Sequence, residues 1–552
     1  MLLLSIAVVV GTLVAMASGK IPPTLALATA IAIAGIFQLA PPEELFAGLS
    51  NGGVITVAAM LVIAKGVIHT GVVSRVTWRL LKTVTSATQV LLRLIAPIGL
   101  FSAMINTTPI VAMLIPAARE LQQTRQIPAR QVLLPMAHAT TLAGSTTLIG
   151  TSSNLLIAGI ATSAGVAVGM FSFAPVAVPV MLVGWAVLLV TAPRMFKAGD
   201  ELDVPDPEWR VEISLDDQAL AIGRTAADLG LDSALDYQLE GISRDRVMHG
   251  PEEVIQDGDR LVFSATEKGV RSLWSSPRLG LDASRLYLAT VASGEHGLLR
   301  ELADEDELVV VAAQTDNALR DTRAIPGELC FLTTHKPRLI DDNSSFSLAT
   351  DVTGKAPQPQ KTWPALLILV LVVVAAAANL APIPIVAIAG AVAMVWARVL
   401  TPRAAVRALD WNVLMILAGS VGLAAIVVSS GIADWIAQTI QDISAGSVPL
   451  VVIVLAVSTT ILTNVTTNAA AASILTPVGI TLAESQGLSP VLILAMIGTA
   501  ISFTFINPFS HQSNLMVMGP GKYSIRSFVR FGIPLTIASV LALCAVGYLL
   551  LA

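Results

Sequence analysis

Four polar clusters interrupt apolar stretches of this 552-residue chain. Two are short and rich in Asn and Thr, INTTP at Ile105–Pro109 and NVTTNA at Asn464–Ala469. Two are longer, GSTTLIGTSSN at Gly144–Asn154 and SFTFINPFSHQSN at Ser502–Asn514. Hydroxyl and amide side chains, with backbone N–H groups freed at a break and the positive ends of helix dipoles, can bind an oxyanion. Freed carbonyls and side-chain oxygens suit a hard cation such as sodium.

The clusters recur in the same order at nearly the same spacing. Asn106 lies 48 residues before Asn154, and Thr467 lies 47 residues before Asn514. Lipid offers no partners to backbone N–H and C=O groups, so such breaks survive only where they line a protein-enclosed or watery cavity. A matched pair of breaks in the two halves of a chain is typical of a transporter's binding site.

The composition predicts a membrane protein. Hydrophobic residues make up 54% of the chain, charged residues 13%, and the mean hydropathy is +0.76. These values are too apolar for a soluble globular protein. The net charge of −5 suggests no nucleic-acid partner. Cys330 and Cys544 have no partner at metal or redox spacing. The sequence does not predict an enzyme, since it has no paired carboxylates, nucleophile elbow or metal-ligand spacing.

Two similar sets of apolar segments flank a polar middle. The first comprises spans at Leu2–Ala17, Pro22–Ala40, Val54–Gly71 and Phe171–Val190, a hairpin at Val90–Leu121 and a broken span at Val132–Ile160. The second comprises spans at Trp363–Leu380, Pro382–Leu400, Val413–Ser430 and Phe531–Leu551, a hairpin at Val448–Leu482 and a broken span at Val491–Met518. Each hairpin arm has roughly fifteen residues, fewer than the ~20 that a spanning helix needs, which predicts re-entrant hairpins. Five spans per half, an odd number of crossings, predict two inverted repeats in an α-helical polytopic membrane protein.

The positions of the charges support this count. With the polar middle placed inside, the inner segments contain many Lys and Arg residues, whereas the outer segments contain none and their charged residues are all acidic, such as Glu43 and Asp434. Residues 198–361 are therefore expected in the cytoplasm and both termini outside, in a cell membrane such as a bacterial inner membrane. Leu2–Ala17 lacks a basic n-region and a cleavage site, which favours a retained span over a removed signal.

We expect five parts: membrane repeats at 1–197 and 362–552, cytoplasmic domains at 198–280 and 281–350, and a linker at 351–361. Strands are predicted at Val211–Asp216, Tyr237–Arg244 and Gly258–Thr266, and helices at Ala219–Leu229 and Glu267–Ser275. This order resembles the RCK C-terminal (TrkA-C) type of domain, an inserted α/β unit. SRLYLATV, ELVVVAAQ and GELCFLTT look like the strands of a second, eroded copy.

The membrane segments resemble the divalent anion:sodium symporter family within the ion transporter superfamily, in its sulfate permease-like branch with central TrkA-C domains. The residues that carry the resemblance are NTTPIVAMLIPAARE, IPARQVLLPMAHATTLAGSTTLIGTSSNLL, TNAAAASILTPV and INPFSHQSNLMVMGPGKYSIRSFVRFGIPL. It implies a homodimer, an elevator-type movement, Na⁺ as coupling ion and a Ser-Asn-Thr motif at each hairpin tip. This chain has Asn106-Thr107-Thr108 and Thr467-Asn468-Ala469 instead. That departure favours sulfate over a dicarboxylate.

The candidate site residues follow from the four clusters. For the substrate they are Asn106, Thr107, Thr108, Ser152, Ser153, Asn154, Thr467, Asn468, Ser513 and Asn514. For the cation they are Asn106, Ser145, Thr146, Gly150, Thr463, Asn464, Asn468, Thr504 and Asn507. No Asp or Glu stands in the broken spans or in the hairpins up to their tips, which argues against a carboxylate proton relay.

Several alternatives stay open. The substrate is sulfate on this interpretation, with a C4-dicarboxylate or another small anion as the alternative. His138 and His511 are the groups that would carry a proton if protons replaced sodium. A ligand-gated channel regulated by the central domain is a third reading, and that domain either binds a small regulatory ligand or steadies the dimer.

Overall fold

The computed structural model separates the chain into two compact units, one formed by Met1–Lys197 with Pro357–Ala552 and the other by Ala198–Ala356. The described residues are 2–17, 21–125, 127–196, 209–215, 221–234, 236–244, 247–274, 276, 279, 285–292, 297–302, 308–315, 317–334, 339, 343, 345–351 and 361–551. Most of the expected linker at 351–361 lies outside these residues.

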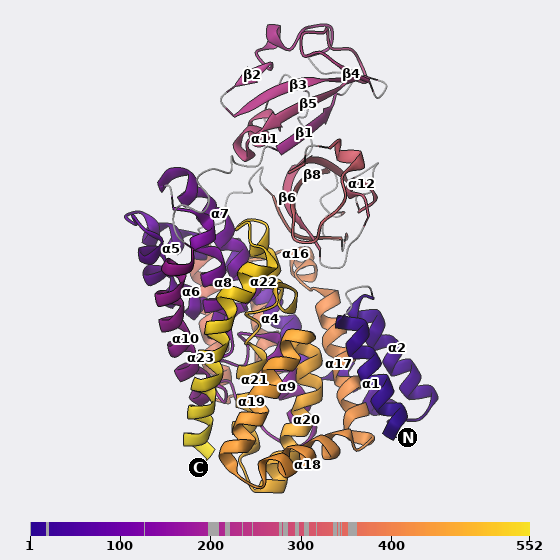
Figure 1. The fold of residues 1–552 in the computed structure, drawn as a ribbon, viewed down its shortest axis with the longest axis vertical. Helices are drawn as coiled ribbons and strands as arrows, with labels where there is room; N and C mark the ends of the chain where they lie inside the picture. Colours follow the sequence, from indigo (N-terminus) through magenta and orange to yellow (C-terminus); the bar gives the residue numbers. More distant parts are fainter. Residues whose placement is uncertain are drawn as a thin grey trace. The chain divides into compact units, whose positions relative to one another are not determined.

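The first unit is helical, and its helices appear in the same order in each half of the chain (Figure 1). The first half contains α1 (Leu2–Ala17), α2 (Pro23–Ile36), α3 (Pro42–Leu45), α4 (Gly52–His69), α5 (Val72–Leu81), α6 (Ala87–Ile105), α7 (Thr107–Arg125), α8 (Leu133–Gly144), α9 (Ser152–Ser163) and α10 (Ala174–Met195). The second contains α14 (Thr362–Ala377), α15 (Ile383–Trp396), α16 (Pro402–Arg407), α17 (Trp411–Ser429), α18 (Ile432–Ser444), α19 (Val448–Val465), α20 (Asn468–Gln486), α21 (Pro490–Ile501), α22 (Gln512–Met518) and α23 (Ile525–Leu551). Every predicted span, hairpin and break corresponds to a helix or an interruption in this order.

Six of the described helices, α4, α6, α10, α17, α19 and α23, are long and apolar enough to cross a membrane. The hairpin arms are longer than predicted: α6, α7 and α20 each have 19 residues, and α19 has 18. Polar residues that favour helix, such as Gln122 and Arg125, extend α7 past its apolar stretch. The short-arm argument was therefore wrong, although the two arms of each hairpin do pack against each other. That the hairpins are re-entrant stays a prediction. Arg125, at the end of α7, donates to the carbonyl of Lys82 at 2.7 Å, just before α6 begins.

The packing of the two halves is reciprocal. Helix α4 packs against α15, its counterpart α17 packs against α2, and α10 lies beside α23 (Figure 1). This exchange is what an approximate two-fold relation between the halves would produce. The opposite membrane orientation of the two repeats stays a prediction.

The same contacts divide the helical unit into two groups. Helices α1, α2, α14 and α15 pack on α4 and α17 in the first group. The hairpins, the broken spans and α10 with α23 pack on one another in the second. The contacts between the groups run mainly through two helices: α4 packs on α9, and α17 packs on α20.

The second unit contains an antiparallel sheet of nine described strands in the order β2-β3-β5-β1-β7-β8-β6-β9, with β4 beside β3. The strands are β1 (Trp209–Ser214), β2 (Ser233–Ala234), β3 (Tyr237–Arg244), β4 (Val247–His249), β5 (Arg260–Ala265), β6 (Arg285–Val291), β7 (Val309–Ala313), β8 (Leu329–Thr334) and β9 (Phe346–Asp351). All six predicted strands are present, and α11 (Glu267–Trp274) matches the second predicted helix. The pairing β3-β5-β1 recurs as β7-β8-β6, with β1 and β7 joining the two sets.

The helix predicted at Ala219–Leu229 is wrong in its described part. Gly223 has a φ of +81°, and only Ala227–Leu229 forms a single 3₁₀ turn. The backbone bonds elsewhere, since Gly223 donates to the carbonyl of Ile255 at 2.8 Å and the Ile255 amide donates to Arg224 at 3.0 Å. Backbone hydrogen bonds to a segment about 30 residues later in the chain have replaced the local helical bonds that the apolar spacing suggested.

Candidate functional site

The first hairpin turns at Asn106, between α6 and α7. Its φ of +115° is rare for any residue except glycine, and such strain gathers at functional sites. The Asn106 Oδ1 accepts a 3.4 Å hydrogen bond from the Thr108 amide. Below the tip, the Ser102 hydroxyl donates to the carbonyl of Thr140 at 2.8 Å and lies 3.2 Å from the Thr107 hydroxyl. These contacts hold the tip against the broken span.

The second hairpin repeats this arrangement. The Thr463 hydroxyl lies 2.8 Å from the carbonyl of Ile501, and this contact spans 38 residues, as does that between Ser102 and Thr140. The same hydroxyl lies 2.9 Å from Asn468 Oδ1. At the tip, Thr467 uses its hydroxyl to accept the Ala470 amide at 3.3 Å, capping α20. The two tips therefore differ, because Thr467 is already engaged as a cap.

The breaks in the two broken spans are each closed by an asparagine in the first turn of the following helix. The Asn154 Nδ2 donates to the carbonyls of Ser145 and Thr147 at 3.0 and 2.9 Å, and the Asn514 Nδ2 donates to that of Thr504 at 2.5 Å. Hydrogen bonds also join the loops to the hairpins. The Thr147 hydroxyl donates to the carbonyl of Ala103 in the first half. In the second half Asn464 Nδ2, on the hairpin, donates to the carbonyl of Phe503.

The remaining candidates lie within the same two clusters. The hydroxyls of Ser145 and Thr146 donate to carbonyls of α8, which leaves their lone pairs available to accept. Gly150 faces Gly144 so closely that a Cβ on it would lie 2.3 Å from the Gly144 carbonyl oxygen, so this backbone contact requires glycine. Asn507 Nδ2 donates to the Asn464 carbonyl at 2.9 Å. Ser153 is buried in the first turn of α9.

Within the four polar clusters, four buried side-chain oxygens have no hydrogen-bond partner among the residues that the structure describes. They are Asn154 Oδ1, Asn464 Oδ1, Thr504 Oγ1 and Asn514 Oδ1. A buried polar atom left without a partner destabilises a protein by roughly 1–3 kcal/mol, so a native structure satisfies it with water or a ligand. Side-chain oxygens together with carbonyls are a donor set that fits sodium.

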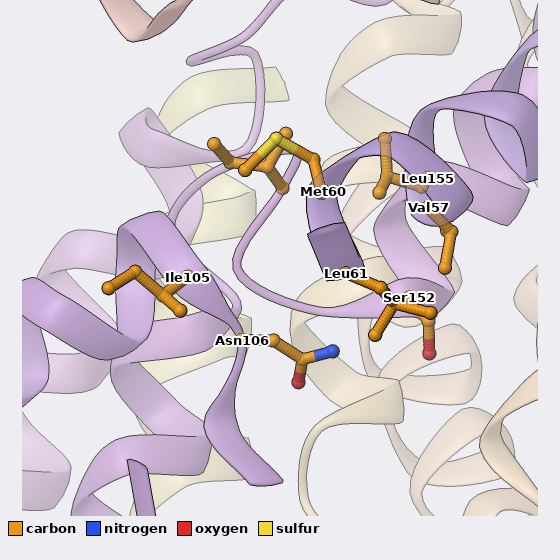
Figure 2. A pocket seen from close by; sticks show the side chains of 8 residues that line it. Val57, Met60, Leu61, Ile105, Asn106, Ser152 and Leu155 are labelled. Carbon is orange, nitrogen blue, oxygen red and sulfur yellow. The ribbon is translucent and has the colours of Figure 1, made fainter. Parts of the chain in front are cut away.

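A small hollow, partly open to its surroundings, lies beside the first tip. Its lining is Val57, Met60, Leu61, Ile105, Asn106, Ile149, Ser152 and Leu155. Figure 2 shows Asn106 extending its carboxamide into this space, with the nitrogen on the side of Ser152. Three of the apolar side chains come from α4, which the sequence marks only as a plain span. None of these three residues is polar, so the pattern of polar clusters does not reveal their part in the hollow.

The four breaks come into one neighbourhood through contacts between the halves. The second arm of each hairpin packs against the broken span of the other half, α7 on α22 and α20 on α9. Helices α7, α9, α20 and α22 all begin at the tips or breaks, where the first N–H groups of a helix lack intrahelical partners. Amide donors, hydroxyls and unpartnered oxygens thus gather without a full charge on the candidate side chains.

The two histidines differ in their surroundings. His138 is buried among Phe505, Phe528 and Phe531, with ring centroids 5.0, 6.4 and 5.8 Å away. It approaches Asn514, but neither ring nitrogen makes a well-formed hydrogen bond with a described residue. His511 caps α22, since its Nδ1 accepts the Ser513 amide at 3.2 Å and lies 2.6 Å from the Ser513 hydroxyl. Nδ1 must therefore be unprotonated in this arrangement.

The chain is similar in sequence to a known family of proteins. The model of the citrate transporter family, CitMHS, matches residues 12–500 and, separately, residues 383–552. The uncharacterized transporter sll0640 of Synechocystis is 28% identical over 98% of this chain and 95% of its own length. A probable sodium/sulfate cotransporter 3 of Chlamydomonas reinhardtii is 26% identical over 50% of this chain and 29% of its own.

One solved structure supports the fold alone. Neisseria gonorrhoeae MtrF, described in a study of antimetabolite efflux pumps, is 11% identical with a TM-score of 0.51, covering 100% of this chain and 94% of MtrF. The family match spans most of the residues, and the matched family is one of transporters, not of enzymes. The chain therefore belongs to the citrate transporter family (CitMHS), in the divalent anion:sodium symporter and ion transporter superfamily, as a multi-pass membrane transporter.

Proposed function

We propose that this protein is a secondary active transporter that moves sulfate across the cytoplasmic membrane, driven by sodium. The observation that carries the proposal is the pair of hairpin tips held against the two broken spans by matching hydrogen bonds. Between them lie helix N-termini that suit an oxyanion and unpartnered oxygens that suit a cation. Sodium would offset part of the negative charge of sulfate in a site of low dielectric, which favours carrying the two together.

Sodium is supported by the donor set. Asn464 and Thr504, both among the candidates for the cation, have buried oxygens without a described partner. Asn154 and Asn514 were expected to bind the substrate, yet the Oδ1 of each makes no well-formed hydrogen bond with a described residue and is equally suited to the cation. No group of three His, Cys, Asp or Glu side chains in the described residues could hold a transition metal. A relative is named a probable sodium/sulfate cotransporter.

Sulfate is supported by the difference between the tips. Asn106 presents its carboxamide to the hollow, whereas Thr467 has its hydroxyl occupied by the Ala470 amide. Only two polar side chains, Asn106 and Ser152, line the hollow. A dicarboxylate needs two equivalent polar ends, so a compact anion fits better. The name of the matched family, citrate transporter, keeps a carboxylate substrate as the alternative.

We also propose that transport is of the elevator type. The hairpins and broken spans would move as one body against the group of α1, α2, α14 and α15, with α4 and α17 forming the sliding contact. The central unit would be cytoplasmic, related to TrkA-C domains, and would dimerise or regulate the transporter. If it only regulates, deletion of Val211–His335 should leave some transport. Loss of the folded homodimer would make it structural instead.

The test is uptake of radiolabelled sulfate into proteoliposomes, with and without an inward sodium gradient. We expect sodium-driven uptake that is lost in Asn106→Ala and in Asn468→Ala. The control is Asn412→Ala, which removes an exposed carboxamide at the start of α17. Stabilisation by a dicarboxylate without sulfate uptake would change the substrate and keep the transporter. Flux that needs no coupling ion would indicate a channel.

A further inference from the structure

Helix α5 is amphipathic, and one of its faces is strongly basic. It is separated from α4 by Gly71, whose φ of +68° ends the preceding helix. Val72, Val73 and Leu81 are buried, and α5 packs against both arms of the first hairpin, α6 and α7. On the opposite face three exposed cations follow one another at helical spacing, namely Arg75, Arg79 and Lys82.

Two more arginines extend this basic face and bind α5 to the hairpin. Arg93 of α6 donates to the Leu80 carbonyl at 3.2 Å and to the Thr83 hydroxyl at 2.6 Å. Arg125 of α7 donates to the Lys82 carbonyl at 2.7 Å. Cations at the C-terminal carbonyls of a helix are favourable because they complement its dipole. Each arm of the hairpin is thereby tied to the end of α5.

The five cations are exposed, and none has an Asp or Glu partner among the side chains that the structure describes. The hydrogen bonds that Arg75, Arg93 and Arg125 donate go to carbonyls and hydroxyls. Five like charges on a small area repel one another in water. Such a face is stabilised by contact with anions.

The second half shows that the fold does not require these charges. Its counterpart α18 also follows a left-handed glycine, Gly431 with a φ of +77°, and also packs on both arms of its hairpin. The residues 360 positions after Arg75, Arg79 and Lys82 are Trp435, Thr439 and Asp442. A helix of the same construction therefore forms without a single cation on this face.

We propose that the cationic face of α5 binds the phosphate groups of anionic phospholipids. A cluster of Lys and Arg immediately beside a membrane-spanning helix attracts anionic lipid, and this cluster follows α4, a candidate span. Each cation near such a surface adds on the order of fivefold in affinity. Arg93 and Arg125 hold α5 to both arms of the first hairpin, so lipid bound to α5 would also influence the position of that hairpin. This last consequence for transport rests on the proposed function, whereas lipid binding does not.

The binding test measures the unfolding midpoint of the purified full-length protein in detergent as dioleoylphosphatidylglycerol or dioleoylphosphatidylcholine is titrated in. We expect only the anionic lipid, dioleoylphosphatidylglycerol, to raise the unfolding midpoint. The variant Arg75→Gln/Arg79→Gln/Lys82→Gln should weaken the apparent affinity for that lipid on the order of 100-fold. The control Arg398→Gln/Arg403→Gln/Arg407→Gln removes three exposed cations that the proposed topology puts on the same side of the membrane, and should keep most of the effect. Arg75→Lys/Arg79→Lys keeps the charge and should retain binding.

Two outcomes would overturn the proposal. Equal losses of affinity in both triple variants would mean that surface charge acts without a specific lipid site. A shift produced by inorganic phosphate alone would mean a free-anion site. If binding is confirmed, sulfate uptake in vesicles with and without the anionic lipid measures its effect on transport. Absence of uptake in every vesicle would count against the proposed function and leave the lipid site intact.

Discussion

Thr463 offers a sharp test of whether the hydrogen bonds beneath the hairpin tips hold the ion site. Its hydroxyl is fully buried and lies within hydrogen-bond distance of both the Ile501 carbonyl and Asn468 Oδ1. Thr463→Val keeps the side-chain shape and removes the hydroxyl. The loss of about one hydrogen bond plus the isolation of a buried carbonyl should destabilise the tip by about 2 kcal/mol. A 2 kcal/mol change corresponds to roughly a 30-fold weaker affinity if sodium requires the intact tip.

The matched control is Thr460→Val, the same substitution one turn earlier on α19. The Thr460 hydroxyl donates to the Ala456 carbonyl at 2.7 Å, within its own helix, where the loss costs little. The assay is the sodium concentration that gives half-maximal sulfate uptake, together with the unfolding midpoint in saturating sodium. We expect Thr463→Val to require far more sodium and Thr460→Val to resemble the wild type. Equal behaviour of the two variants would refute the reasoning.

Two further predictions concern movement and pH. Val57 on α4 and Leu155 on α9 line the same hollow, so a disulfide between Val57→Cys and Leu155→Cys should block uptake until it is reduced. The control is a disulfide between Gly66→Cys and Met394→Cys, which lie within one helix group, and it should leave uptake unchanged. Equal inhibition by both disulfides would contradict the elevator movement. In the second unit burial tends to raise the Asp259 pKa, but two 2.8 Å hydrogen bonds from Arg244 and one from the Gln256 amide hold that pKa below its ordinary value. The stability that this carboxylate adds is therefore present above its unfolded pKa, near 4, and is lost as the pH falls through the folded value. Arg244→Gln should move acid unfolding of β3 and β5, followed by hydrogen exchange, to higher pH, and an unchanged midpoint would exclude this role.

The sequence was informative where a physical rule leaves few choices. Lipid forbids unpaired backbone groups, so polar clusters in apolar segments had to mark breaks, and the helices do end at Ile105, Gly144, Val465 and Ile501. In the second unit the alternation of apolar and polar residues likewise identified the strands. The positions of the candidate residues followed from these two patterns.

Other features depend on contacts that no local pattern contains. Helices α5 and α18 are short, and each begins after a glycine in left-handed conformation; what their faces contact is decided only by the packing of the hairpins. The Ser102–Thr140 and Thr463–Ile501 bonds join residues 38 positions apart. The helix predicted at Ala219–Leu229 does not form in its described part, because this segment bonds instead to Val254 and Ile255. In each case tertiary structure overrode local preference.

The apolar wall of the hollow has a consequence for how such transporters diversify. Val57, Met60 and Leu61 belong to α4, whereas the unpartnered oxygens belong to the hairpins and broken spans. Mutations in the wall can enlarge or narrow the room for a cargo without removing a single oxygen of the candidate ion site. Under the proposed function, substitutions in this wall would change which anion is carried and leave the coupling to sodium unchanged.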